Sequence, residues 1–183
     1  MAVELSYAPI VILPKERDPR LITIRRGGTL AESDHHLHGL WAAACAEHVL
    51  PFFEAERPTN TRPRAAIAAI RAWTRGTMKM MDSRAAGGHA MGAARELTGA
   101  ARYSAYAAGQ AACVAHLAEH NLGAAAYAIK AARAGRPGDE ELAGHCECAW
   151  QREQLPEAIR ALVIEDQRRR NEICWRVFEF SPS

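Results

Sequence analysis

Apolar residues recur every three to four positions along most of the chain, which is the spacing of helices that bury one face. The segment 34–53 follows this pattern directly after a suitable N-cap, Ser33 or Asp34. A second helix is expected to hold Pro63 in its first turn and to stop at Gly76. The faces predicted from this spacing place the following residues in the core: Trp41, Ile70, Trp73 and Leu117.

The stretch 78–117 is dominated by Ala and Gly and is predicted to be helical with at least one break. Gly87-Gly88 and Thr98-Gly99 are the two candidate positions for this break, because glycine inside a helix costs about 1 kcal/mol relative to alanine. Further helices are expected over residues 121–134, from 139 to Pro156, and over 157–170. The pattern predicts an all-α fold, a single compact bundle of about six to eight helices.

The sequence before these helices has a different character. Pro9, Pro14 and Pro19 interrupt it, and the β-branched run LITIRRGG ends in a glycine pair. This composition predicts an extended arm or a short strand with a turn. We therefore expect residues 1–33 to form an N-terminal arm and residues 34–183 to form the helical domain.

Composition narrows the class of protein further. The chain has 183 residues, of which 38 are Ala, and this size and helix-favouring composition suit one soluble helical domain. Its five cysteines are odd in number and scattered, which favours reduced thiols in the cytoplasm. The N-terminus lacks the charge pattern of a signal peptide, and the longest uncharged stretch, 103–118, is too short and polar to span a membrane. No basic motif with interleaved aromatic residues indicates nucleic acid as a partner.

The charges are unevenly distributed, with a net charge of +5 over residues 34–137 and −4 over 138–150. Arg64, Arg71 and Arg75 are predicted to share one helix face, because offsets of seven and eleven residues come close to whole turns. The acidic segment contains Asp139, Glu140 and Glu141 at an expected helix start, followed by Glu147. Either surface is a candidate for binding a protein partner, an acidic one at the arginines or a basic one at the carboxylates.

Histidines supply the candidates for metal binding. His116 and His120 are four residues apart, which places two imidazoles on one helix face, and His48 is a third candidate ligand. Leu117 stands where the zinc-protease motif requires Glu, and the sequence holds no nucleophile elbow, P-loop or dinucleotide motif. No catalytic residue and no cofactor are therefore predicted, and a metal-binding helical protein, with hydrolysis as its activity, stays open as the alternative.

The tetrapeptide GAAR occurs at residues 92–95 and again at 99–102, one heptad apart. Small residues at this spacing are expected to fall on one helix face, where another helix can approach closely. Neighbouring helices of the same chain would suit such a face. A second copy of the chain would also suit it, so a homo-oligomer is a further possibility.

Four sequence blocks occur together in one order: CAEHVL, the block from RPR to RAW, HLAEHNLGAAAYA, and the tryptophan block WQREQLP. In this respect the chain resembles the Imm-5-like family of immunity proteins, over residues 20 to 163. The resemblance implies an all-helical bacterial protein from a toxin and immunity locus. Its expected function is to bind a cognate protein toxin and to neutralise it by occlusion, without catalysis.

Overall fold

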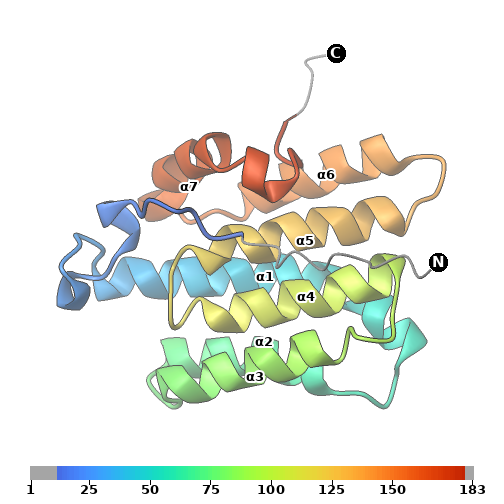
Figure 1. The fold of residues 1–183 in the computed structure, drawn as a ribbon, viewed down its shortest axis with the longest axis horizontal. Coiled ribbons are helices and arrows are strands. Elements are labelled where there is room, and N and C mark those ends of the chain that lie inside the picture. The colour runs from blue at the N-terminus through green and yellow to red at the C-terminus, as the bar shows by residue number, and fades with distance from the viewer. Residues whose placement is uncertain (1–11, 180–183) are drawn as a thin grey trace, which may run out of the picture.

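The computed structural model describes residues 12–179, which form seven α-helices and three short 3-10 helices (Figure 1). The α-helices are α1 (Glu32–Glu56), α2 (Arg62–Thr74), α3 (Met80–Gly92), α4 (Gly99–Cys113), α5 (His120–Ala134), α6 (Glu140–Glu153) and α7 (Glu157–Arg169). The 3-10 helices are η1 (Pro19–Leu21), η2 (Ile24–Arg26) and η3 (Glu172–Cys174). The predicted all-α bundle is thus confirmed. Within residues 12–179, no helix is both long and apolar enough to span a membrane.

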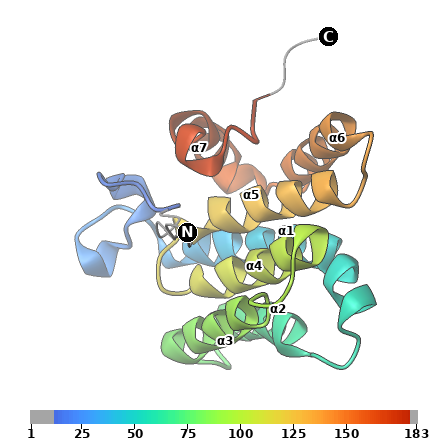
Figure 2. The same ribbon diagram turned by 45° about the vertical axis from the view of Figure 1, so that its right-hand side comes forward.

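The helices are stacked in tiers around a shared core. Figure 1 shows α2 and α3 at one end, α1 and α4 in the next tier, and α5 beyond them. Helix α4 contacts α1, α2, α3 and α5, so it forms the centre of the molecule. Helices α6 and α7 lie on the far side of α5 from α2 and α3 (Figure 2). The main core is therefore shared by helices from the whole length of the chain.

Alanine and glycine allow the helices around α4 to approach closely. The inward alanines of α4 are buried, with exposed fractions of 0 to 1%. A Cβ atom added at Gly87 would lie 2.6 Å from the carbonyl oxygen of Gly109, so α3 and α4 meet almost backbone to backbone. Of the two candidate breaks, the one at Gly87-Gly88 does not occur, because both glycines lie inside α3 and Gly87 packs against α4. The break at Thr98-Gly99 is confirmed, since α4 begins there and Gly99 has a φ of 57°.

The small residues of the two GAAR repeats do not share a helix face. Residues 92–95 end α3 and enter a turn, whereas residues 99–102 open α4. The small-residue face of α4 is buried against neighbouring helices of the same chain. The surface expected to receive a second copy is therefore used inside the molecule.

Helix α1 is longer than predicted at both ends. It begins at Glu32 after Ala31, so neither Ser33 nor Asp34 is the N-cap. Glu32 and Asp34 instead lie in the first turn, where carboxylates favour the positive end of the helix dipole. The helix also continues through Pro51 to Glu56, because packing against α2, α4 and α5 outweighs the local cost of proline.

Two of the four expected core residues are fully buried, Trp41 at 1% and Ile70 at 0% exposed. Trp73 is partly buried and packs against the main core, so its placement was right only in part, whereas Leu117 is partly buried outside both core clusters and its placement was wrong. Trp73 lies near the end of α2, and Leu117 lies in the connection between α4 and α5. Both residues line a pocket beneath the N-terminal segment, which explains their partial exposure.

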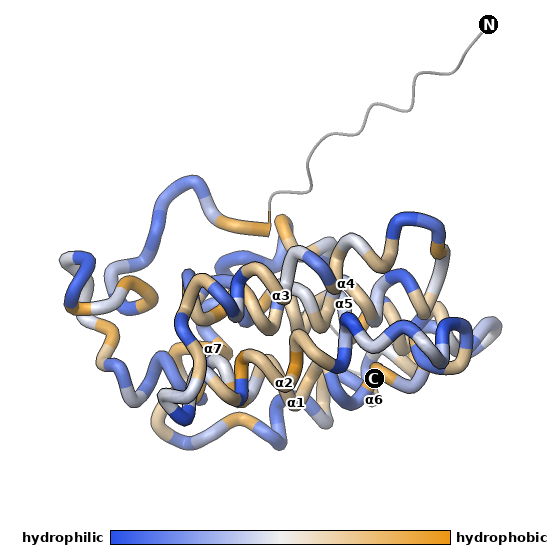
Figure 3. Tube along the Cα trace, turned by 90° about the horizontal axis from the view of Figure 1, so that it is seen from below, coloured by the Kyte–Doolittle hydropathy of each residue, from blue (hydrophilic) through white to orange (hydrophobic). Residues whose placement is uncertain are grey.

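Residues 12–31, here called the arm, precede α1 and lie against the helices. The arm contains η1, η2 and one isolated parallel bridge between Thr23 and Leu30, in place of the predicted extended segment or strand. Hydrophilic and strongly hydrophobic residues alternate along it (Figure 3). Leu21 and Leu30 are buried with Ala118 in a second, smaller core. The expectations for Pro9 and the rest of residues 1–11 lie outside the described residues.

Candidate functional site

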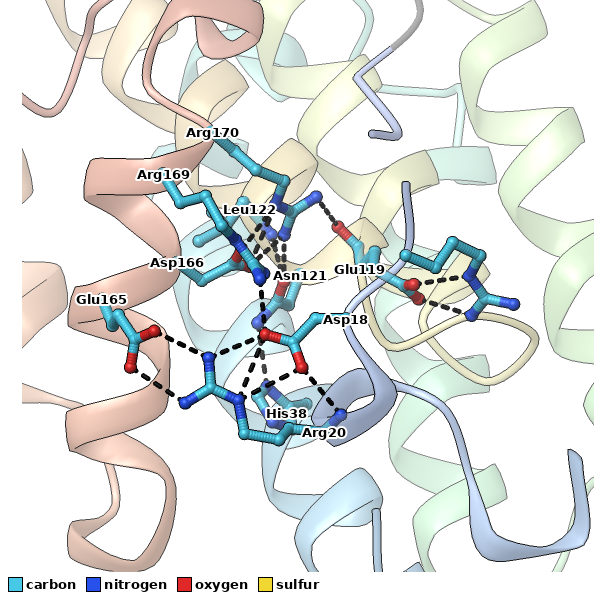
Figure 4. A network of polar contacts seen from close by, with 11 residues as sticks. Asp18, Arg20, His38, Glu119, Asn121, Leu122, Glu165, Asp166, Arg169 and Arg170 are labelled. Atoms are coloured by element: carbon cyan, nitrogen blue, oxygen red, sulfur yellow. Dashed lines mark hydrogen bonds and ion pairs between the residues drawn. The ribbon is translucent and has the colours of Figure 1, made fainter. Parts of the chain in front are cut away.

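A set of ion pairs fastens the arm to the helices (Figure 4). Arg17 donates from Nε to Glu119 Oε1 at 2.6 Å and from an Nη to Oε2 at 2.9 Å. The Glu119 side chain is 1% exposed, whereas that of Arg17 is 35% exposed. Paired guanidinium–carboxylate contacts of this kind are short and directional, so they fix the arm at the start of α5.

A second group of charges connects the arm to α7. Arg20 donates to both carboxylate oxygens of Asp18 and, at 2.7 and 2.9 Å, to those of Glu165. Arg169 also donates to Asp18, which is buried. Hydrogen bonds from Arg20 hold the pKa of the Asp18 carboxyl well below its ordinary value, so Asp18 stays ionised. We call these contacts, together with Arg17–Glu119, the clasp.

A buried polar chain lies behind the clasp (Figure 4). Arg170 and Asp166 form an ion pair that is almost fully buried, and an Nη of Arg170 also donates to Asn121 Oδ1 at 3.3 Å. The backbone N–H of Leu122 donates to the same oxygen at 2.6 Å. The amide oxygen of Asn121 is thereby fixed, and its amide nitrogen donates to His38 Nδ1 at 2.8 Å.

This chain sets the protonation state of His38. Because Nδ1 accepts a hydrogen bond from Asn121, the neutral imidazole carries its proton on Nε2. Within the described residues, His38 Nε2 is buried and has no hydrogen-bond partner. Burial lowers the pKa of His38 to about 4, and the side chain is therefore neutral at pH 7.

A pocket of about 480 Å³ lies between the arm and the helices. The arm contributes residues from Arg17 to Leu30, and the helical body contributes Glu32, His35, Trp73, Met80 and residues 115–118. Cavities of this volume fall within the range of small-molecule sites. The clasp forms part of its wall, since Arg17 both lines the pocket and binds Glu119.

The histidines of this pocket lie in a positive environment. His35 donates from Nε2 to the carbonyl oxygen of Val114 at 2.7 Å, and burial lowers its pKa. Burial also lowers the pKa of His116, and the nearby Arg26 and Arg84 lower it further. Both imidazoles are thus driven towards their neutral forms by desolvation and by adjacent arginines.

The structure does not bring the three histidines predicted as metal ligands together. His48 donates from Nδ1 to the buried carboxylate of Glu147 at 2.7 Å and stacks on Trp150 with ring centroids 3.7 Å apart. His120 instead donates from Nδ1 to Gln110 Oε1 at 2.7 Å, beside α4. No cluster of three or more His, Cys, Asp or Glu residues suited to a metal ion occurs within residues 12–179. The geometry therefore gives no support to the metal-binding alternative built on His48, His116 and His120.

The predicted basic face is largely neutralised by α1. Arg64 pairs with Glu54 at 2.7 Å, and Arg71 pairs with Glu47 at 2.7 Å through two hydrogen bonds. These contacts hold the pKa of both glutamates below its ordinary value. The three arginines do line one shallow surface, as their spacing predicts, but only Arg75 has no carboxylate partner within residues 12–179.

The acidic segment is more exposed than the basic face. Asp139, Glu140 and Glu141 are all solvent-exposed around the start of α6, and backbone hydrogen bonds lower the pKa of Glu140. Glu141 contacts Arg133 at 2.7 Å but its side chain is 92% exposed. Glu147 is buried and bonded to His48, so it does not belong to this surface.

Comparison with protein families identifies the helical body. The family model described as "Imm-5 like putative immunity protein" matches residues 28–158. The chain belongs to this Imm-5-like family. The match covers α1 to α6 and the first residues of α7, whereas Arg17, Arg20, Glu165 and Arg170 lie outside it. Curated proteins and solved structures provide no match to the chain.

Sequence reasoning missed the clasp and the buried chain behind it. Arg17 and Glu119 are 102 positions apart, and nothing local to either residue indicates the other. One weak signal was present at the end of α7, where the run Arg168–Arg170 follows Glu165 and Asp166 at intrahelical ion-pair spacing. That spacing indicates a charged helix end, but it does not indicate that Arg170 is buried.

Proposed function

We propose that this Imm-5-like protein binds a cognate protein toxin in the bacterial cytoplasm and neutralises it by occlusion, without catalysis. Membership of an immunity-protein family over residues 28–158 is the observation that carries the proposal. An inhibitor of this kind needs a stable scaffold and a complementary surface rather than a reactive site. The closely packed helices around α4 supply such a scaffold.

The acidic turn, defined as residues 139–141, is the surface we propose for the toxin. Its carboxylates are exposed, and among the described residues only Glu141 of the three pairs with a cation, Arg133, whereas Arg64 and Arg71 both bind glutamates of α1. Charges that are free to meet a partner accelerate association, while charges engaged in internal pairs contribute less. A basic toxin surface is therefore the complementary partner, within an interface that buries about 1,600 Å² in total.

Co-expression with the toxin encoded beside this gene tests the function. We expect the protein to restore growth of cells that produce the toxin and to form a complex with the purified toxin. Removal of the charges in the variant Asp139→Asn/Glu140→Gln/Glu141→Gln should slow association at least tenfold at low salt, with a smaller effect at high salt. Failure to protect against, or to bind, any adjacent gene product would contradict the proposal.

A matched control separates the acidic turn from a general charge effect. Glu96 is exposed in the turn between α3 and α4, away from α6, so Glu96→Gln should leave association unchanged. Arg75→Gln tests the predicted basic face, because Arg75 is exposed and has no carboxylate partner among the described residues. If Arg75→Gln slows association and the acidic-turn variant does not, the toxin binds the basic face instead.

A further inference from the structure

The pocket between the arm and the helices carries an excess of positive charge. Three arginines line it, Arg17, Arg25 and Arg26, and Glu32 is its acidic lining residue. Glu119 neutralises Arg17 through two hydrogen bonds, so three cations against two carboxylates leave one net positive charge. Arg25 is exposed and has no hydrogen-bond or ion-pair partner within residues 12–179.

Arg26 is held in place by the body of the protein. It donates from one Nη to the carbonyl oxygen of His116 at 2.8 Å, and its other Nη lies 3.9 Å from the sulfur of Met80. No carboxylate among the described residues pairs with Arg26. A guanidinium fixed in this way needs little reorganisation when an anion arrives, so less rotamer entropy is lost on binding.

The pocket also offers apolar surface beside its charged and polar groups. Leu21, Ile24, Leu30, Trp73 and Met80 supply aliphatic, aromatic and thioether surface, and Ile24 is 65% exposed. A small ligand would therefore contact hydrophobic surface as well as charge. A cavity of this volume that offers both apolar surface and charged groups suits a small organic molecule that carries both.

His116 provides an unused polar atom at the same place. Its Nδ1 is buried and has no hydrogen-bond partner among residues 12–179, although His116 lines the pocket. Burial lowers the pKa of His116, and the nearby Arg26, Arg84 and Arg17 lower it further.

We propose that this pocket binds a small organic carboxylate with an apolar body, its carboxylate contacting Arg25 and Arg26 and its body packing on Trp73. One net positive charge favours a singly charged carboxylate over a doubly charged phosphate. The volume of about 480 Å³ accommodates a ligand of roughly ten heavy atoms. This ligand site goes beyond the proposed toxin binding and does not depend on it.

Titration of the full-length protein with 3-phenylpropanoate tests the proposal, with 3-phenylpropanamide and phenyl phosphate as comparisons. Binding is followed by NMR at the indole N–H of Trp73, assigned with Trp73→Phe, and at the imidazole of His116. We expect saturable shifts at both groups with the carboxylate, and binding at least tenfold weaker for the amide, which lacks the charge. Phenyl phosphate should bind no more tightly than the carboxylate.

Two arginine variants and one control complete the test. Arg25→Gln removes a charge that makes no hydrogen bond or ion pair within residues 12–179, so it should weaken carboxylate binding about tenfold without changing the melting temperature. Arg26→Gln should weaken it similarly, and Arg95→Gln, at an exposed turn after α3, should have no effect. Equal affinity for the amide, unsaturable shifts, tighter binding of phenyl phosphate, or unchanged binding by Arg25→Gln would each overturn the proposal.

Discussion

Acidification should destabilise the protein through His38, whose side chain is 0% exposed. Its pKa is about 4 in the folded protein, against about 6.5 in the unfolded chain. Between these two values the unfolded state binds more protons than the folded state, so stability falls as the pH falls. The contribution is fully present above pH 6.5 and is lost progressively towards pH 4.

The size of this effect follows from the two pKa values. Between pH 7 and pH 5 the unfolded imidazole becomes almost fully protonated while folded His38 stays mostly neutral, which amounts to about 2 kcal/mol of lost stability. The contact with Asn121 cannot accept a protonated His38 without rearrangement, because Arg170 fixes Asn121 as a donor to His38 Nδ1. A protonated His38 would place two donors against each other at that contact.

Urea unfolding at pH 7 and pH 5 measures the effect in the native protein and in two variants. His38→Asn removes the titrating group. Between pH 7 and pH 5, the free energy of unfolding of this variant should therefore fall by about 2 kcal/mol less than that of the native protein. His89→Asn, at an exposed position on α3, is the matched control and should behave like the native protein. The reasoning is refuted if the native protein and His38→Asn lose equal stability, or if NMR shows His38 titrating near pH 6.5.

Three further predictions concern stability at neutral pH. Trp41→Ala should lower the free energy of unfolding by about 4 kcal/mol in urea unfolding, since Trp41 is 1% exposed; a loss below 1 kcal/mol would contradict this. Gly87→Ala should lower the melting temperature, because the added Cβ would lie 2.6 Å from the backbone of α4. Gly88→Ala, whose Cβ would have no atom within 4 Å, should raise the melting temperature by a few degrees. A higher melting temperature for Gly87→Ala than for Gly88→Ala would contradict the close approach of α3 and α4. Arg17→Ala should cost about 2 kcal/mol and increase hydrogen exchange in the arm, and adding Glu119→Gln should recover part of the loss; no recovery would contradict a buried unpaired charge.

The helices could be predicted from sequence because their signals are local. Pro63 and Gly76 bound α2, and Gly99 opens α4, as expected from the backbone preferences of proline and glycine. Of the two candidate breaks, the one at Gly87-Gly88 is absent, although intrinsic propensity favoured a break there. Helix α4 presents Gly109 at the contact, and this tertiary packing keeps α3 continuous.

The candidate site could not be predicted for the opposite reason. Arg17 and Glu119 lie 102 positions apart, and Arg20 and Glu165 lie 145 apart, so their pairing depends on the complete fold. Arg64 and Arg71 on α2 show the same dependence on the complete fold. Their position on one helix face was predicted correctly, but their glutamate partners on α1 were not predicted. Spacing along one helix locates a charge, and only the packing of another helix decides whether that charge is free.

The two proposed sites should be separable by experiment. The acidic turn lies inside the family-matched segment 28–158, whereas Arg25 and Arg26 of the carboxylate pocket precede it. The turn begins α6, while the pocket is formed by the arm with residues of α1, α2, α3 and the α4–α5 connection. Substitutions at well-separated positions without shared partners usually act independently.

Arg25→Gln should therefore abolish most carboxylate binding and leave toxin protection intact, and the triple substitution in the acidic turn should do the reverse. Both variants are tested in the NMR titration and in the growth assay with the toxin. Loss of protection by Arg25→Gln would show that the arm pocket is part of the toxin interface. In that case Arg25 would bind an acidic side chain of the toxin rather than a small organic carboxylate.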